Sequence, residues 1–322
     1  MRERAGPPLQ GGLPPTGPVT GAVVEIACDE SGFSGTNLLD PATPVITHAS
    51  VDLSVAEAVA LIAALRSGWV HSPSEFKSGR FLRGPNAGAA PAWFLAELTG
   101  RAHVHVVDKE YYLVTRIVDL FLAEPSYAAG TRLTQDHRPA ALSLYRAGRP
   151  AGPGWAALLA AFVDLVRTKR RHRPDHRSFE RFFQARDALV RGGLPAPAAG
   201  VLDGLSRPRV WAVLTRLSDD DRSIPPPLEP MLPALAETVL FWSGGRRRVL
   251  VIHDEQSALT AGRLTRLQAA LADGAGPSPL AGLVTVDSRD DPRVQVADLL
   301  AGMARRLPRP FLSPTSLWDP ER

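Results

Sequence analysis

The amino-acid sequence predicts an α/β protein in which strands from both ends of the chain form one sheet, with a long helical segment inserted between them. Short strand patterns alternate with helical patterns over residues 21–123 and again over residues 244–307. The intervening residues, 124–243, show helical periodicity interrupted by proline and glycine, with no clear strand. Alternating strands and helices favour a layered α/β architecture. The sequence therefore predicts a sheet-bearing core made of two separated segments and a helical insertion or subdomain.

The first part of the core is predicted from short apolar runs and from helical spacing of apolar residues. The strands are bounded by turn residues, and the helices repeat apolar residues three and four positions apart. In chain order the expected elements are a strand at 23–28, a strand at 44–53, a helix at 54–68, a charged glycine-bearing loop at 71–88, a helix near 89–99, a strand at 103–109 and a helix at 110–123.

The second part of the core follows the insertion and has the same alternation. Its expected elements are a strand at 246–255, a helix at about 257–272, a strand at 282–288 and a helix at 293–306. The two ends of the chain lie outside this pattern. We expect a flexible leader over 1–20, which is rich in proline and glycine, and a C-terminal tail over 308–322.

The composition is that of a globular protein, with 322 residues of which 44% are hydrophobic. The single cysteine, Cys28, cannot form an intramolecular disulfide, and no thiol cluster is present to bind zinc. Residues 1–20 lack the apolar core of a signal peptide, and no uncharged apolar run reaches the roughly 18 residues of a membrane span. We therefore expect a cytoplasmic protein without a membrane partner. The formal charge of +4 favours anionic partners without requiring them.

Acidic residues recur where the expected strands end. They are Asp29, Glu30, Asp108, Asp254, Glu255 and Asp287. A single acid at such a place is explained by turn formation or helix capping. Because ligand sites of open α/β sheets form at the carboxyl ends of strands, repeated acids there are expected to converge. Crowded carboxylates repel one another unless a cation is present, and oxygen ligands without an organised Cys or His set favour Mg²⁺ or Mn²⁺ over zinc.

Asp298 is a further acid, in the helical segment VQVADLLAG, whose apolar residues extend almost all round the helix. A carboxylate in this setting is expected to be partly buried and to need a partner. Arg293, Arg305 or a backbone donor could supply an ordinary structural partner. Gln295, at the other edge of the same helix face, favours a metal or active-site role for Asp298.

Five segments together resemble the DUF3800 family. They are DESG at 29–32, EFKSG at 75–79, VVDK at 106–109, VIHDE at 251–255 and VDSRDDPRVQVADLLAG at 286–302. Their order and spacing match across most of the chain outside 124–240 and the leader. The resemblance implies a three-layer α/β fold, an RNase H-like mixed sheet flanked by helices. It places presumed catalytic acids at Asp29, Glu75, Asp254 and Asp298, with Glu30 and Glu255 as neighbours.

These acids imply the chemistry of a two-metal nuclease. Two Mg²⁺ or Mn²⁺ ions held by carboxylates can activate a water and stabilise the leaving oxygen of an in-line phosphoryl displacement. Asp29 would bridge the two ions, while Glu75, Asp254 and Asp298 would complete their ligand shells.

Two lysines lie beside acids of this set. Lys77 follows Glu75 closely and is expected to contact a phosphate or a carboxylate, although a solvated lysine is an equally open interpretation. Glu75 and Lys77 also have the E-x-K form of a restriction-type nuclease, but Pro73 and the following glycine favour a loop rather than the strand that such a site occupies. Lys109, next to Asp108, recurs in the family pattern, and no physical reason assigns it a role.

A basic cluster at 167–177, RTKRRHRPDHR, contains six Lys or Arg residues in eleven positions. Phosphate backbones are the natural counterpart of such a cluster, which makes Lys169, Arg170, Arg171 and Arg173 candidate nucleic-acid contacts. The arginine-rich composition of the whole chain is the alternative explanation.

Other aromatic residues and histidines are expected to pack in the interior. Phe179, Phe182 and Phe183 have helical spacing and fit a helix core better than base stacking. His253 should lie on the sheet face opposite Asp254. His103 and His105 share a strand face but lack a third metal ligand.

The sequence as a whole predicts a Mg²⁺- or Mn²⁺-dependent nuclease that hydrolyses DNA or RNA. The main alternative is a non-catalytic RNase H-like protein that binds nucleic acid or acts as an adaptor, for example in a defence or mobile-element system. A phosphotransferase of the actin-like fold is disfavoured because such enzymes need glycine-rich phosphate loops in two repeated halves. The sequence does not specify whether the substrate is DNA or RNA, or whether cleavage is endonucleolytic or exonucleolytic. It also does not specify protein partners or the oligomeric state.

Overall fold

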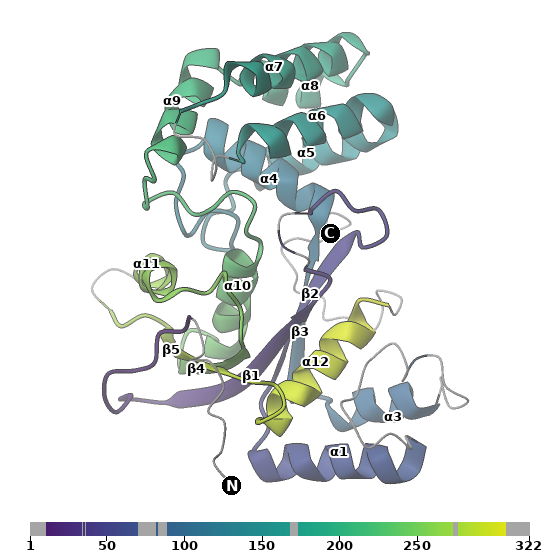
Figure 1. Cartoon of the computed structure of the whole chain (residues 1–322), viewed down its shortest axis with the longest axis vertical. Coiled ribbons are helices and arrows are strands. Elements are labelled where there is room, and N and C mark those ends of the chain that lie inside the picture. The colour runs from purple at the N-terminus through teal and green to yellow at the C-terminus, as the bar shows by residue number, and fades with distance from the viewer. Residues whose placement is uncertain are drawn as a thin grey trace, which may run out of the picture. The chain divides into compact units, whose positions relative to one another are not determined.

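A computed structural model describes residues 11–33, 35, 37–69, 82, 89–167, 173–272 and 276–306. The chain forms two compact units (Figure 1). The sheet unit contains the described residues within 1–33, 46–106 and 234–315, and the helical unit contains those within 34–45 and 107–233. Each unit is therefore built from segments that are far apart in the sequence.

The sheet unit is built on a mixed sheet, and its five strands among the described residues have the order β3-β2-β1-β4-β5. The strands are β1 (Val23–Ser31), β2 (Val45–Val51), β3 (Ala102–Asp108), β4 (Arg248–Asp254) and β5 (Leu280–Val286). β1 is antiparallel to β2 and parallel to β4, and β4 is parallel to β5. Segments from both ends of the sequence thus lie side by side, as the periodicity predicts.

β1 extends further than its apolar run predicts. The sequence places Asp29 and Glu30 after the strand, whereas in the structure both lie within it and pair opposite Ala49 and His48 of β2. Backbone pairing continues because the antiparallel neighbour supplies partners beyond the apolar residues. Alternation along the strand then sends the two acids to opposite faces of the sheet.

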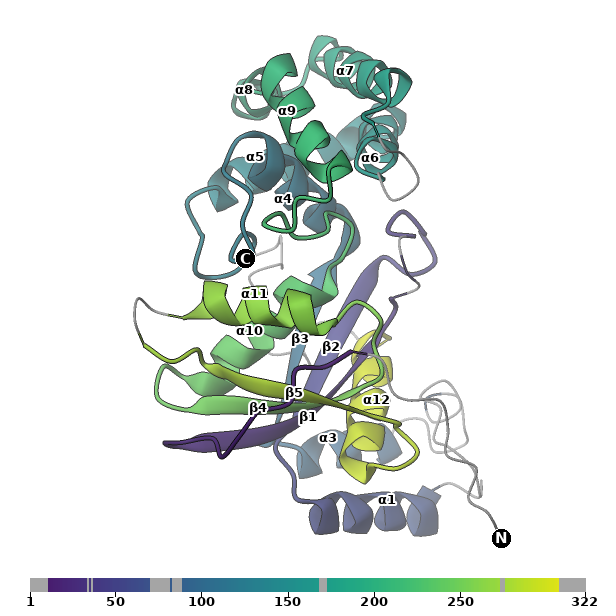
Figure 2. The same cartoon turned by 60° about the vertical axis from the view of Figure 1, so that its left-hand side comes forward.

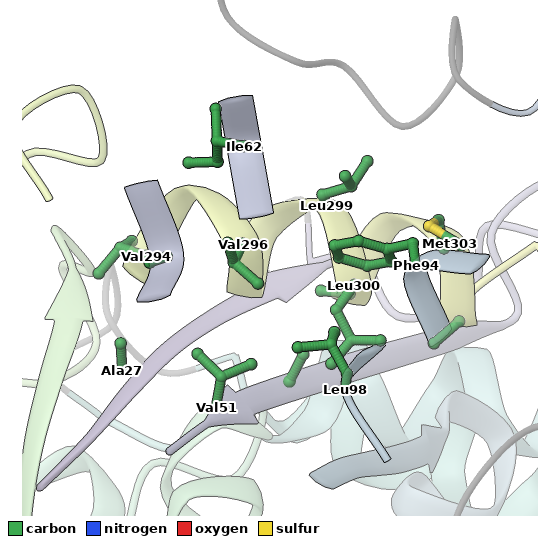
Figure 3. Close-up of a cluster of buried hydrophobic side chains, with 14 of the residues drawn as sticks. Ala27, Val51, Ile62, Phe94, Leu98, Val294, Val296, Leu299, Leu300 and Met303 are labelled. Atoms are coloured by element: carbon green, nitrogen blue, oxygen red, sulfur yellow. The ribbon is translucent and has the colours of Figure 1, made fainter. Parts of the chain in front are cut away.

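Helices α1 (Val55–Trp69), α3 (Ala89–Glu97) and α12 (Pro292–Ala304) cover one face of the sheet (Figures 1 and 2). Their apolar side chains form one core with strand residues, shown in Figure 3 by Ala27, Val51, Ile62, Phe94, Leu98, Val294, Val296, Leu299, Leu300 and Met303. Full burial of each larger aliphatic side chain contributes about 1.5–3 kcal/mol. This packing holds α12 against β1.

The start of α12 is fixed by its own capping residues. Pro292 occupies the first turn, where a missing N–H costs nothing, and Asp291 accepts a hydrogen bond of 2.9 Å from the Arg293 N–H. The Arg293 guanidinium also pairs with Asp291 at 2.6 Å and with Glu25 of β1. These contacts tie the beginning of the helix to the sheet.

Helices α10 (Met231–Ser243) and α11 (Ala261–Leu271) lie on the other face, which gives three layers (Figure 2). Polar contacts accompany the packing on this side. The Trp242 Nε1–H of α10 donates to Ser50 Oγ of β2 at 2.8 Å, and the Gln268 amide of α11 donates to the Leu280 carbonyl of β5 at 2.9 Å.

Residues 11–13, which the sequence predicts to lie in a flexible leader, are hydrogen-bonded to the sheet unit. Leu13 forms an antiparallel bridge with Leu283 of β5, and the Gly12 N–H donates to the Leu259 carbonyl at 2.9 Å. Gly12 has a φ of +84°, a conformation that glycine adopts without strain. The segment therefore lies along the outer edge of β5.

The helical unit contains α4 (Lys109–Phe121), α5 (Arg138–Gly148), the short 3₁₀ helix η1 (Arg149–Ala151), α6 (Pro153–Leu165), α7 (His176–Arg191), α8 (Ala196–Asp203) and α9 (Arg207–Ser218). The sequence assigns 110–123 to the sheet-bearing core, but α4 belongs to this unit, and it assigns 234–243 to the insertion, but this part of α10 belongs to the sheet unit. Phe179, Phe182 and Phe183 of α7 are buried, which confirms their predicted place in a helix core. In the described part of the chain, no helix has the length and apolar character needed to cross a membrane.

Candidate acidic site

Three aspartates, Asp29 of β1, Asp254 of β4 and Asp298 of α12, form the candidate site, and the charges of Asp254 and Asp298 act on the Asp29 carboxyl. Asp29 follows Ala27 by two positions in β1, and Asp254 follows Ile252 by two positions in β4. Ala27 and Ile252 belong to the core beneath α12, so strand alternation directs both acids to that face. Asp298 is half-buried on α12 itself. Three of the four acids proposed from the sequence therefore come from elements that pack together.

Asp29 is the most buried of these acids, with 6% of its surface exposed. Burial raises the pKa of its carboxyl well above its usual range, and the negative charges of Glu30, Asp298 and Asp254 raise it further. One contact opposes these effects, since the Glu30 N–H donates to Asp29 Oδ1 at 2.7 Å. The ionised form of Asp29 is thus disfavoured in the metal-free protein, and a bound cation would reverse this preference.

Asp254 is oriented by the loop that follows β5. The Ser288 N–H donates to Asp254 Oδ1 at 3.1 Å, which leaves the other carboxylate oxygen for a further contact. Asp287, in the same loop, has a different role. It forms an exposed ion pair with Arg289 at 2.5 Å, and hydrogen bonds from that residue lower the pKa of the Asp287 carboxyl to about 2.

Glu30 points to the opposite face of the sheet from Asp29 and is held by Gln256, a glutamine outside the set of candidates from the sequence. Gln256 Nε2 donates to Glu30 Oε1, while Gln256 Oε1 accepts from the Ala258 N–H at 3.2 Å. Gln256 is only 8% exposed. Its position directly after the segment VIHDE was its one signal in the sequence. The neighbouring Glu255 is exposed.

Gln295 is half-buried on α12, and its amide donates to the Arg289 carbonyl at 3.4 Å. This hydrogen bond attaches α12 to the loop that carries Asp287 and Ser288. Arg293, offered above as an ordinary partner for Asp298, is engaged by Asp291 and Glu25 instead. Arg305 donates to Ser31 Oγ at 3.1 Å.

Asp108 and Lys109, the other candidates at a strand end, have contacts inside the helical unit. Asp108 is the N-cap of α4, accepting from the Tyr111 N–H at 2.9 Å, and it also accepts from the Tyr145 hydroxyl at 3.1 Å. Lys109 is buried, and its ammonium donates to Thr43 Oγ1 at 3.2 Å. Capping and packing explain both side chains without a catalytic role.

Several candidates lie outside the residues that the structure describes. They are Glu75, Lys77, Lys169, Arg170 and Arg171. Arg173, at the end of the basic cluster, is described and exposed. The fourth acid of the proposed set and most of the basic cluster are therefore known from the sequence alone.

The described side chains meet only part of the requirement for a divalent cation. Carboxylate oxygens at Asp29, Asp254 and Asp298 are the donors that Mg²⁺ and Mn²⁺ prefer, and the negative charges of Asp298 and Asp254 near the buried Asp29 favour a cation. Within the described ranges, however, no three His, Cys, Asp or Glu side chains are gathered closely enough to hold a metal ion. The chemistry of the donors fits these ions, and a full ligand shell needs donors beyond the described side chains.

Comparisons with protein-family models, with curated proteins and with solved structures find no match for the chain. Functional conclusions therefore come from the sequence patterns and from the contacts described above.

Proposed function

We propose that the protein is an RNase H-like nuclease that uses Mg²⁺ or Mn²⁺ to hydrolyse phosphodiester bonds of DNA or RNA. The observation that carries the proposal is the placement of Asp29, Asp254 and Asp298 on three elements that pack together, with the charges of Asp298 and Asp254 acting on the buried Asp29 carboxyl. An RNase H-like architecture is supported by the mixed sheet, in which β1 has an antiparallel neighbour on one side and a parallel neighbour on the other, with helices on both faces.

In this proposal Asp29, Asp254 and Asp298 hold the cations together with Glu75. When bound, the ions supply a water of lowered pKa and stabilise the negative charge of the leaving oxygen. Other residues of the protein orient these carboxylates. The Ser288 amide fixes one oxygen of Asp254, and Gln256 fixes the carboxylate of Glu30. The packing of α12 sets the position of Asp298.

A second candidate is a nucleic-acid-binding or adaptor protein without catalytic activity. It is favoured by the finding that the described residues contain no ready-made group of three metal ligands. Under this alternative, Asp29 would be a buried carboxyl that stays protonated, and the basic cluster that ends near Arg173 would contact phosphates.

The test combines metal binding with cleavage for wild type, Asp29→Asn and the control Asp287→Asn. Asp287 also follows a strand, but its charge is satisfied by Arg289. We expect calorimetric titration with Mg²⁺ or Mn²⁺ to show binding to wild type and Asp287→Asn but not to Asp29→Asn. Cleavage of single- and double-stranded DNA and RNA should follow the same order.

Two outcomes would contradict the nuclease proposal. One is a wild-type protein that binds neither ion, with or without nucleic acid. The other is equal cleavage by wild type and Asp29→Asn. Nucleic-acid binding without metal or cleavage would instead support the adaptor.

A further inference from the structure

A chain of buried polar side chains crosses the sheet face opposite the acidic site. It joins Thr238 of α10, His48 of β2 and His253 of β4, all of which are fully buried. His48 Nδ1 lies 2.8 Å from Thr238 Oγ1, and His48 Nε2 lies 3.1 Å from His253 Nε2. β1 runs between β2 and β4, so the two rings meet over the strand that carries Asp29.

The last contact of this series of hydrogen bonds determines which ring nitrogens carry protons. His253 Nδ1 lies 2.8 Å from the main-chain oxygen of Asp254, and a carbonyl can only accept, so His253 Nδ1 carries the proton. In the neutral ring, His253 Nε2 is then the acceptor, which makes His48 Nε2–H the donor. His48 Nδ1 in turn accepts from the Thr238 hydroxyl. Burial, followed by the neighbouring histidines, lowers the pKa of His48 well below its ordinary value, which supports a neutral ring at this position.

The chain of hydrogen bonds reaches the acidic site through the backbone of Asp254. From one face of the sheet, His253 holds the Asp254 carbonyl oxygen, and from the loop after β5, the Ser288 N–H holds Asp254 Oδ1. The main chain and the carboxylate of one residue are therefore fixed by two independent hydrogen bonds. Without the bond from His253, the peptide after Asp254 could rotate and the carboxylate could shift.

We propose that His48 and His253 are positioning residues that orient Asp254, an inference that rests on the role given to Asp254 in the proposed nuclease site. They orient this residue rather than transfer protons, because the chain ends on a carbonyl oxygen that has no proton to pass on. Supporting groups of this kind around metal ligands typically contribute about 10–100-fold to metal affinity or activity.

The wild-type protein provides the first test and needs no substitution. Two-dimensional ¹⁵N NMR of the histidine rings distinguishes a protonated from an unprotonated ring nitrogen. We expect the proton at Nδ1 of His253 and at Nε2 of His48. The opposite tautomer of His253 would overturn the proposal, since its ring could not then hold the Asp254 carbonyl.

Three variants then separate positioning from packing. His48→Phe keeps a planar ring and removes the donor to His253, whereas His48→Gln keeps an N–H near the place of Nε2. Ser50→Ala is the matched control, because Ser50 is also a buried polar residue of β2 on this face but contacts the His103 carbonyl and Trp242. Hydrogen exchange of the Ser288 amide in metal-free protein reports on the Asp254 carboxylate.

We expect exchange at Ser288 to accelerate about tenfold in His48→Phe, to return toward wild type in His48→Gln and to be unchanged in Ser50→Ala. The nuclease assay should show a matching loss in kcat with an unchanged KM for nucleic acid. Equal exchange in folded His48→Phe and Ser50→Ala would overturn the positioning role. If the exchange pattern appears but wild type cleaves nothing, the nuclease proposal fails while the orientation of Asp254 by the histidines stands.

Discussion

Asp29 combines deep burial with repulsion from Glu30, Asp254 and Asp298. Because its folded-state pKa is raised, the folded protein binds this proton more tightly than the unfolded chain. The resulting stabilisation is complete below the unfolded pKa of about 4 and is lost as pH rises through the folded value. Above the unfolded pKa, Asp29 therefore makes the folded metal-free protein less stable than a group that carries no charge would.

Replacement of Asp29 by Asn should stabilise the metal-free protein. The amide keeps an oxygen that accepts from the Glu30 N–H but removes the charge. We expect the free energy of unfolding in urea with EDTA at pH 8 to increase by about 1–3 kcal/mol, and the difference to vanish near pH 3. An Asp29→Asn variant less stable than wild type at pH 8 would mean that other groups already compensate the Asp29 charge.

At the scale of elements, β5 would be an open edge without residues 11–13. Gly282 permits the close approach of this segment, since a Cβ there would lie 2.8 Å from the Leu13 carbonyl oxygen. We expect Gly282→Ala to displace the segment and to lower the free energy of unfolding by about 1–3 kcal/mol. Gly262→Ala, in α11, is the control, because its Cβ would meet only a flexible Arg266 side chain at 3.4 Å. Equal effects of the two substitutions in urea unfolding would show that the segment contributes little.

Outside residues 124–243, local patterns predicted the strands and helices and their order along the chain, because these depend on hydrophobic period. The apolar run 246–255 became β4 (Arg248–Asp254), and the pattern at 293–306 became α12. The same patterns gave the end of β1 incorrectly, since backbone pairing with β2 extends that strand past its last apolar residue.

Contacts between distant side chains left no comparable signal in the sequence. Gln256 and Glu30 are 226 positions apart, and His48 and His253 are 205 positions apart. His253 was correctly predicted to be a packed residue, but its partner could not be inferred before the register of the sheet was known. Asp29 and Asp254 of the candidate site were easier to single out because each follows an expected apolar strand.

At the scale of the whole molecule, a formal charge of only +4 makes local clusters more important than net charge for an anionic partner. The cluster at 167–177 is the densest basic segment singled out from the sequence, and its described member Arg173 is exposed. If this cluster binds a nucleic-acid backbone, each phosphate that it neutralises releases counterions and makes the affinity depend on salt.

Replacing Lys169, Arg170, Arg171 and Arg173 together by Ala should weaken nucleic-acid binding and flatten its salt dependence. For each phosphate that the variant no longer neutralises, the slope of log K against log salt should decrease in magnitude by about 0.9 on duplex DNA and about 0.7 on single strands. Fluorescence anisotropy with a labelled oligonucleotide between about 50 and 200 mM salt measures the slope. A second variant that replaces the exposed residues Arg246 and Arg247 removes two charges instead of four, so the two slope changes are compared per charge removed. If both variants change the slope equally per charge removed, binding follows net charge and the cluster has no particular role.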